Sequence, residues 1–305
     1  MARLPIVHHP AYTASSMPPK HRFPMNKYQA LAQHLIENEL VTDMAAFHSP
    51  IPAPRAWLEM GHNAAYVAAV LGGGLSEAEQ RKIGFKVNEP IALRSRMSAS
   101  GTLLAARLAL EFGVAANTAG GSHHADRGEG AGFCVFNDVG VAASMLLAEG
   151  VVSQILVLDL DVHQGDGTAR IFADEPRAFT ASIHCEQNWP RRKAMSDLDI
   201  GLERETGDEG YLAVLAETLP DLLERTKPDL VFYNAGVDPH IDDRLGLLSL
   251  SDDGLAARED YVARMVVDKG IPLCGVLGGG YGDDPSVIAA RHAMMFKAFA
   301  GAMPS

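Results

Sequence analysis

The chain has 305 residues, 47% of them hydrophobic, and a formal net charge of −12 at pH 7. This composition is sufficient for a large core, and so acidic a chain disfavours a nucleic-acid-binding surface. An acidic rim around a site could instead attract a cationic substrate, such as a lysine-bearing peptide or a polyamine.

Cysteine usage and hydropathy suggest where the protein resides. The three cysteines (Cys134, Cys185 and Cys274) are widely spaced and form no C-x-x-C pair. This is typical of reduced thiols rather than of disulfides or a zinc finger. No apolar run reaches the roughly 20 residues of a membrane-spanning helix, and the N-terminus has no signal-peptide core. We therefore expect a soluble cytoplasmic protein without a membrane span; the sequence leaves its oligomeric state open.

Apolar periodicity predicts strands and helices that alternate along most of the chain. In chain order we expect a strand at 4–7, a loop at 12–24, a helix at 28–40 with Asn26 as N-cap, and a helix at 62–71. A long helix follows from an N-cap at Ser98 to residue 112, then a strand at 114–118, a Gly-rich loop at 120–133, a helix at 137–149 and a strand at 155–158. The remaining elements are a strand at 178–183, a loop at 188–206, a helix at 210–225, a strand at 230–233, a helix at 252–268, a strand at 271–277 and a helix at 285–299.

Strands that alternate with helices indicate an α/β fold, with a mainly parallel sheet covered by helices on both faces. No linker, repeat or low-complexity segment divides the chain, so we predict one domain over 1–305. Ligands of such sheets bind beyond the carboxyl ends of the strands. Polar clusters follow several of the predicted strands, and we expect them to face one crevice.

The central cluster follows the predicted strand 155–158. Asp159, Asp161 and His163 occupy alternate positions there, and strand geometry would point all three to one face. Two carboxylates buried together require a cation or a proton to offset their charge. An Asp-x-His pair at a strand end suits a divalent metal, although solvated aspartates at an ordinary strand end are the alternative.

Two further clusters lie in the Gly-rich region. G-G-S-H-H-A-D contains His123 and His124, which could be metal ligands, a pair of bases, or simply solvated. G-F-C-V-F-N-D contains Gly132 and Phe133. Phe133 could line a narrow apolar channel or belong to the core.

The last two clusters follow the strands 230–233 and 271–277. Asp238 is a candidate third metal ligand or a turn residue before proline. The glycines 278–280 let the backbone approach a ligand closely, and Tyr281 could donate a hydrogen bond to an oxyanion or lie in an exposed turn. A metal with an open position, a histidine base and a phenol together suit metal-assisted amide hydrolysis.

Taken together, the clusters resemble the zinc-dependent histone deacetylase family, within the superfamily that includes acetoin utilisation proteins and acetylpolyamine amidohydrolases. The matching segments are G-G-S-H-H-A-D, G-F-C-V-F-N-D, D-L-D-V-H-Q-G-D-G-T, N-A-G-V-D and G-G-G-Y. R-F-P-M-N-K-Y and S-I-H-C-E-Q-N-W-P are most similar to class IV and its bacterial relatives. The resemblance covers essentially the whole chain and implies an arginase/deacetylase-like three-layer αβα fold forming a single catalytic domain.

By position, the resemblance implies that Asp161, His163 and Asp238 hold one catalytic Zn²⁺. His124 would be the general base and also the acid for the leaving amine, and Tyr281 would polarise the acyl carbonyl.

The resemblance also implies supporting roles. His123 would be an electrostatic partner, and Asp159 and Asp166 would accept an imidazole N–H from His123 and His124 respectively. The substrate-binding residues would be Gly132, Phe133 and Gly279. A structural K⁺ or Na⁺ would lie near Asp159, Asp161, His163 and Ser182.

Two departures from the family pattern stand out. Gln164 occupies the position of a second histidine in many relatives, where we expect modest consequences. The Pro-rich segment before His62 does not match the acidic rim loop of class I enzymes, so no residue is assigned to grip the substrate backbone.

The expected activity is removal of an acetyl or longer acyl group from Nε-acyl-lysine in a protein or peptide. The alternatives are an acetylated polyamine or another small acylated amine as substrate, and a non-catalytic acyl-lysine-binding protein. The latter would predict loss of Tyr281, a zinc ligand or a tandem histidine, and none is lost. A dinuclear manganese ureohydrolase would need an acid two residues after His163, where Gly165 stands.

Overall fold

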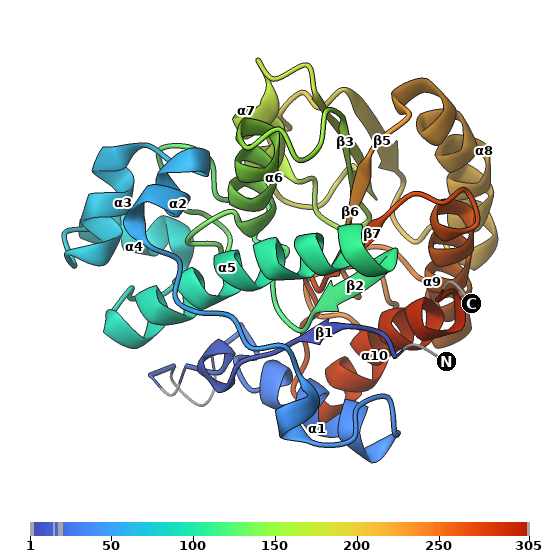
Figure 1. Ribbon diagram of the computed structural model, residues 1–305, viewed down its shortest axis with the longest axis horizontal. Helices are drawn as coiled ribbons and strands as arrows, with labels where there is room; N and C mark the ends of the chain where they lie inside the picture. The colour runs from blue at the N-terminus through green and yellow to red at the C-terminus, as the bar shows by residue number, and fades with distance from the viewer. Residues whose placement is uncertain (1–2, 15, 18–20, 304–305) are drawn as a thin grey trace.

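The computed structural model describes residues 3–14, 16–17 and 21–303. Its centre is a sheet of parallel strands in the order β1-β2-β7-β6-β3-β4-β5 (Figure 1). The strands are β1 (Ile6–Val7), β2 (Val114–Asn117), β3 (Ile155–Asp159), β4 (Ala178–Cys185), β5 (Leu198–Leu202), β6 (Leu230–Asn234) and β7 (Leu273–Val276). Every residue of β3, β6 and β7 is buried, as expected for strands covered on both faces.

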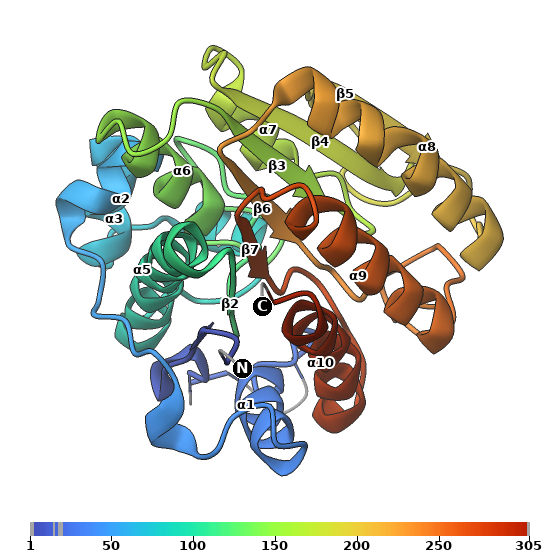
Figure 2. The same cartoon turned by 45° about the vertical axis from the view of Figure 1, so that its right-hand side comes forward.

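Helices cover both faces of the sheet, which gives the three-layer α/β architecture predicted from the sequence. They are α1 (Lys27–Glu37), α2 (Arg55–Gly61), α3 (Ala64–Leu71), α4 (Glu77–Ile83), α5 (Glu89–Phe112), α6 (Asp138–Ala148), α7 (Asp166–Phe172), α8 (Asp208–Thr226), α9 (Asp252–Val267) and α10 (Pro285–Gly301). Helices α1, α10, α9 and α8 lie along one side of the sheet, with α5 and α6 on the other (Figure 2).

The sheet register brings the chemistry-bearing segments together. β3 lies between β6 and β4, and Asp159 at its end is level with Asn234 of β6 and Ser182 of β4. Because all these strands are parallel, their carboxyl ends meet at one edge of the sheet. The segments that follow β2, β3, β6 and β7 therefore converge there.

The predicted start of the long helix at Ser98 is wrong. Ser98 is buried inside α5, which begins at Glu89. Its N-cap is Asn88, whose side chain accepts a hydrogen bond from the backbone N–H of Ile91 at 3.2 Å. Pro90 in the first turn completes a start signal. Serine is common at helix N-caps, which led to the wrong boundary. Inside this helix the hydroxyls of Ser95 and Ser100 instead donate to backbone carbonyls of the preceding turn.

Several short elements were also missed. The predicted loop 188–206 contains β5, an edge strand whose first four residues alternate between half-buried and exposed. Helix α4 was not expected, although Ser76 and Glu79 form a capping box at its start. The short helices α2 and α7 were missed as well. Asn26 precedes α1 without a side-chain cap bond. In the predicted loop 12–24, residues 15 and 18–20 lie outside the described residues.

A buried ion pair supports the strand that carries the central cluster. Arg258 on α9 is fully buried, and its guanidinium donates to Glu259 at 2.5 Å and to the carbonyl of Leu160, just beyond β3, at 3.1 Å. The other carboxylate oxygen of Glu259 accepts from the Tyr233 hydroxyl at 2.7 Å.

We expect Arg258→Met to lower the free energy of unfolding by about 3–5 kcal/mol, because it leaves the Glu259 carboxylate buried without its cation. Arg264→Met, on the exposed side of the same helix, should change it by less than about 0.5 kcal/mol. Urea denaturation of both variants measures the difference. Equal stabilities would show that the buried pair contributes little.

Candidate active site

Three buried side chains meet beyond the ends of β3 and β6. Asp161, His163 and Asp238 offer ligand atoms that all lie within 4.8 Å of one another. The Nδ1 atom of His163 is 3.0 Å from Asp161 Oδ1 and 3.1 Å from Asp238 Oδ2. Both aspartates are fully buried. The structure thus brings together the three residues that the sequence suggested as metal ligands.

Backbone N–H groups fix both carboxylates. Asp161 Oδ2 accepts from Gly279 N at 2.6 Å, and Asp238 Oδ1 accepts from Val162 N at 2.9 Å. Gly279 is required for this approach, because a Cβ there would lie 2.0 Å from Asp238 Oδ2.

Burial and the neighbouring charge of Asp161 raise the pKa of Asp238. Two carboxylates buried this close together need positive charge beside them, and a bound cation would supply it. Mixed carboxylate and imidazole ligands of this kind suit zinc or a similar divalent metal.

His123 lies beside this group and is held by a carboxylate. Its Nδ1 is 2.7 Å from Asp159 Oδ2, and its Nε2 is 3.8 Å from Asp161 Oδ1. Asn234 donates to the other oxygen of Asp159 at 2.9 Å. Burial opposes the charged form of His123, but Asp159 and Asp161 outweigh it and raise the pKa of His123 to about 9.

His124 has a similar partner but the opposite electrostatic character. Its Nδ1 is 2.7 Å from Asp166 Oδ1, and Arg170 donates to the other oxygen of Asp166 at 2.6 Å. Burial, reinforced by the positive charge of His123, lowers the pKa of His124 to about 3. With Nδ1–H donated to Asp166, the Nε2 of a neutral His124 is left as an acceptor.

A cavity of about 570 Å³ opens above these groups. His124, His163 and Tyr281 lie among its lining residues, together with Gly132, Phe133 and Trp189. Phe133 and Tyr281 have ring centroids 5.9 Å apart, and Trp189 stands edge-on to His124 at 4.5 Å. Burial, followed by the charge of Asp238, raises the pKa of Tyr281 well above its usual value, so the phenol keeps its proton at neutral pH.

Phe133 lines this cavity in a strained backbone conformation. Its φ is +68°, which is rare for a bulky residue. The N–H groups of Gly132 and Phe133 donate to the carbonyls of Lys82 at 3.2 Å and Ile83 at 2.7 Å, so the end of α4 holds the turn. Strain maintained by surrounding contacts is typical of functional sites.

Trp189 and Lys27 belong to this region but were not singled out from the sequence. Trp189 lies in a segment read as a loop, and only the pattern N-W-P signalled it. Lys27 on α1 is buried, and its ammonium donates to the Gly278 carbonyl at 3.1 Å. It is 3.4 Å from His292 Nε2. A lysine in a predicted helix is normally expected at the surface, so nothing in the sequence indicated that Lys27 is buried.

Ser182 and Gln164 lie outside the cavity. A small cavity beside β3 is lined in part by Asp159, Gly165 and Ser182, while Asp161 and His163 turn toward Asp238. The buried side chain of Gln164 bonds to Ala194 and Asp199. Although Gln164 follows His163 in the sequence, its side chain therefore holds the segment that contains Ala194 and Asp199.

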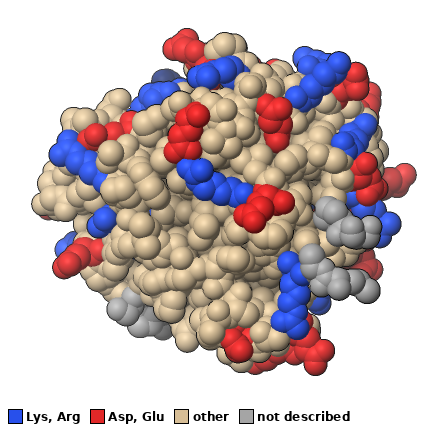
Figure 3. All heavy atoms as spheres, in the orientation of Figure 1, with Lys and Arg blue, Asp and Glu red and all other residues tan. Residues whose placement is uncertain are grey.

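Among the described residues, no helix is long and apolar enough to cross a membrane. On the face shown in Figure 3, basic and acidic side chains are interspersed and form no single basic patch.

Comparison with known families decides the relationship. The model of the histone deacetylase domain matches residues 21–298. The chain belongs to the histone deacetylase family. Histone deacetylases are hydrolases, so this histone deacetylase homologue is a deacetylase, and the resemblance seen in its motifs is confirmed at the level of the family.

Relatives extend the comparison across the chain. An uncharacterized protein of Picosynechococcus sp. is 45% identical over 96% of this chain and 97% of its own. Histone deacetylase 2 of Arabidopsis thaliana is 29% identical over 92% of this chain and 75% of its own. A probable deacetylase of Methanothermobacter thermautotrophicus is 30% identical over 68% of this chain and 65% of its own.

Solved structures show the same fold. A crystal structure of a histone deacetylase homologue complexed with SAHA superposes with a TM-score of 0.83 at 23% identity, over 98% of this chain and 84% of the other. The HDA15 HD domain gives a TM-score of 0.81 at 19% identity, over 100% of this chain and 92% of the other.

Proposed function

We propose that this deacetylase is a zinc-dependent amidohydrolase that removes an acetyl or longer acyl group from Nε-acyl-lysine. The observation that carries the proposal is the buried Asp161–His163–Asp238 group, with His124 and Tyr281 beside it at one cavity. This arrangement contains a metal-binding group, a neutral base and a protonated phenol, which together suit hydrolysis of an unactivated amide.

Asp161, His163 and Asp238 would hold one Zn²⁺. The fit rests on three buried ligand atoms of suitable chemistry, two of them from carboxylates buried side by side, which favours a cation. A zinc ion held there would polarise the acyl carbonyl and lower the pKa of a bound water.

The histidines divide the proton chemistry. Nε2 of His124 accepts the proton of the attacking water, and Asp166 stabilises the imidazolium that results. The same proton then passes to the nitrogen of the leaving amine. His123, whose Nδ1 is held 2.7 Å from Asp159 Oδ2, acts as an electrostatic partner.

Tyr281 and the cavity walls act on the substrate. The phenol donates a hydrogen bond to the acyl oxygen as negative charge develops there. Gly132 and Phe133 line the passage for the acyl-lysine side chain, and Trp189 forms a further wall. Gly279 keeps the backbone close to the carboxylates that would hold the metal.

The same proposal includes a structural monovalent cation, a single catalytic domain and a place beside class IV. The small cavity at Asp159 and Ser182 supports a structural K⁺ or Na⁺, near the strand that also carries Asp161 and His163. The single sheet supports one catalytic domain over 1–305. The segments R-F-P-M-N-K-Y and S-I-H-C-E-Q-N-W-P support a place beside class IV.

Hydrolysis of acyl-lysine peptides by zinc-loaded protein tests the proposal. The series should include acetyl, octanoyl and myristoyl groups, because the acyl preference measures the space beyond Phe133. We expect turnover that a chelator abolishes and added Zn²⁺ restores. Activity that survives metal removal would contradict the proposal. So would bound zinc without turnover of any peptide, which would instead favour a binding protein.

A further inference from the structure

The mouth of the active-site cavity is lined by basic rather than acidic side chains. His21, Arg22 and Lys82 are among its lining residues, and the described residues that line it include no Asp or Glu. Arg22 is exposed. These lining side chains are opposite in sign to the net charge of −12 of the whole chain.

His21 is fixed at this rim. Its Nε2 lies 3.0 Å from the Gly84 carbonyl, and its Nδ1 accepts from Phe23 N at 3.0 Å. Its ring meets Phe133 edge-on with centroids 5.7 Å apart. The segment that carries Arg22 is therefore attached to the wall of the passage.

A second group of cations lies close to Trp189 in the sequence. Trp189 lines the cavity, and Arg191, Arg192 and Lys193 come directly after it in W-P-R-R-K. Arg191 and Arg192 are exposed. Lys193 donates to the carbonyls of Asn188 and Pro190 at 2.7 and 3.0 Å, which ties the basic turn to the wall.

Gln164 anchors the far end of this turn. Its amide oxygen accepts from Ala194 N at 2.7 Å, and its amide nitrogen donates to the Ala194 carbonyl at 3.0 Å. Gln164 directly follows His163 in the sequence. The backbone of the basic turn is thus held by the same segment that carries the candidate metal ligand, next to the cavity wall at Trp189.

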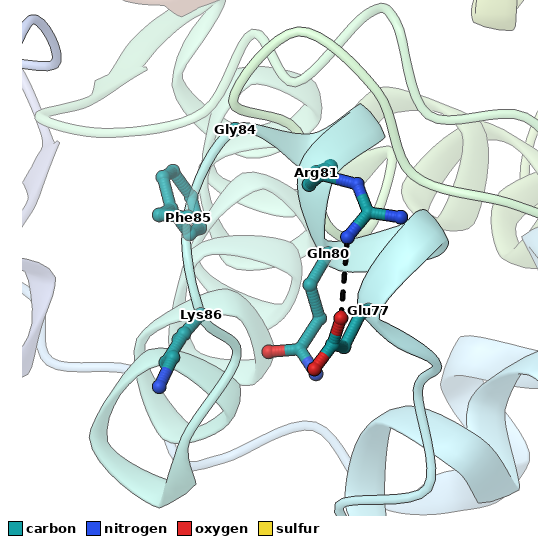
Figure 4. Close-up of a pocket in the computed structure, with 6 residues that line it drawn as sticks. All are labelled: Glu77, Gln80, Arg81, Gly84, Phe85 and Lys86. Atoms are coloured by element: carbon teal, nitrogen blue, oxygen red, sulfur yellow. Dashed lines mark hydrogen bonds and ion pairs between the residues drawn. The ribbon is translucent and has the colours of Figure 1, made fainter.

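Neighbouring acids offset part of this charge. Lys82 is paired with Glu129, and Glu186 is an exposed acid just before the basic turn. In a second hollow, which Gly84 also lines, Arg81 is paired with Glu77, as Figure 4 shows, and Lys86 is a further cation. Arg22 has no ion-pair partner among the described residues and lines the cavity, and Arg191 and Arg192 add two exposed cations close to Trp189 in the sequence.

We propose that the residues at the mouth favour acylated amines in which a carboxylate lies close to the acylated side chain. This rests on the proposed function and narrows its substrate class. Two sources share the chemistry: acidic residues that flank an acyl-lysine in a peptide, and the α-carboxylate of free Nε-acyl-lysine. Polycationic carriers are disfavoured, both acetylated polyamines and lysine-rich peptides, because like charges repel at a mouth where encounter begins.

The test compares acetyl-lysine peptides of equal length flanked by Glu, Gln or Lys, together with free Nε-acetyl-lysine and an acetylated polyamine. We expect kcat/KM to be about three- to tenfold higher for the Glu peptide than for the Lys peptide. The difference should shrink as ionic strength rises from about 0.01 to about 0.15 M, because the Debye length falls from roughly 30 to roughly 8 Å. Efficient turnover of free Nε-acetyl-lysine would identify the small-molecule source.

Charge reversal assigns the effect to the mouth. Arg22→Glu and the double variant Arg191→Glu/Arg192→Glu should each lower the ratio of Glu-peptide to Lys-peptide kcat/KM at least about threefold. The matched control is Lys269→Glu, an exposed cation just before β7 at the opposite end of the sheet, which should leave the ratio unchanged.

A ratio near one in the native protein, or a preference for the Lys peptide or the polyamine, would overturn the proposal. If no peptide is hydrolysed by zinc-loaded protein, the proposed function fails. Dissociation constants of the same peptides, fluorescently labelled, then decide the charge preference. Tighter binding of the Glu peptide than of the Lys peptide, weakened in both mouth variants, supports the charge preference. Equal binding of the two peptides contradicts it.

Discussion

Replacement of Asp161 by alanine is expected to abolish zinc binding and turnover together. The change removes one of three ligand atoms from the candidate metal group and leaves Gly279 N without its acceptor. His163 and Asp238 would then offer only two side-chain ligands. Because a metal contributes several kcal/mol to this class of reaction, kcat should fall on the order of 1,000-fold or more.

Elemental analysis of purified protein, with turnover measured on the same sample, checks this result. Asp174→Ala is the matched control, because Asp174 is exposed between α7 and β4, away from the carboxyl ends of the strands. It should keep one zinc per chain. Thermal unfolding shows whether Asp161→Ala remains folded. A folded variant with unchanged zinc content would prove the ligand assignment wrong.

The sequence predicted the centre of the sheet well because the signal there is local. Buried parallel strands are short, apolar runs, so β3, β6 and β7 were found within one or two residues. The alternation of Asp159, Asp161 and His163 also lies within one segment. Asp238 was suggested by its place after β6, and the register between β3 and β6 brings it to the other two.

The rest of the site depends on contacts that no local pattern records. Burial of Lys27 comes from packing of α1 against α10 and the glycine loop. Trp189 reaches His124 only because the segment after β4 folds back over the site. Net charge gave no indication that His21, Arg22 and Lys82 line the cavity, because net charge averages over a surface whose local groups are arranged separately.

Tyr281→Phe is expected to lower kcat by about 10²- to 10³-fold while zinc stays bound, the range typical for loss of one donor to an oxyanion. Phenylalanine preserves the ring that packs near Phe133 and His163 and removes only the hydroxyl. Because the hydroxyl is needed most as negative charge develops on the acyl oxygen, the loss should appear in kcat more than in KM.

Tyr261→Phe provides the matched control for this change. Tyr261 on α9 also has a hydroxyl with one partner, the Ala216 carbonyl at 3.3 Å, but it lies on the helical layer away from the cavity. Loss of the Tyr261 hydroxyl should leave kcat and zinc content unchanged.

Full activity in Tyr281→Phe would show that the phenol takes no part in the mechanism. Loss of zinc in that variant would mean that the hydroxyl supports the metal group instead. Only a fall in kcat with the metal retained and the control unaffected places the hydroxyl on the acyl oxygen, since substrate is then bound and the metal is present, but the developing charge lacks its donor.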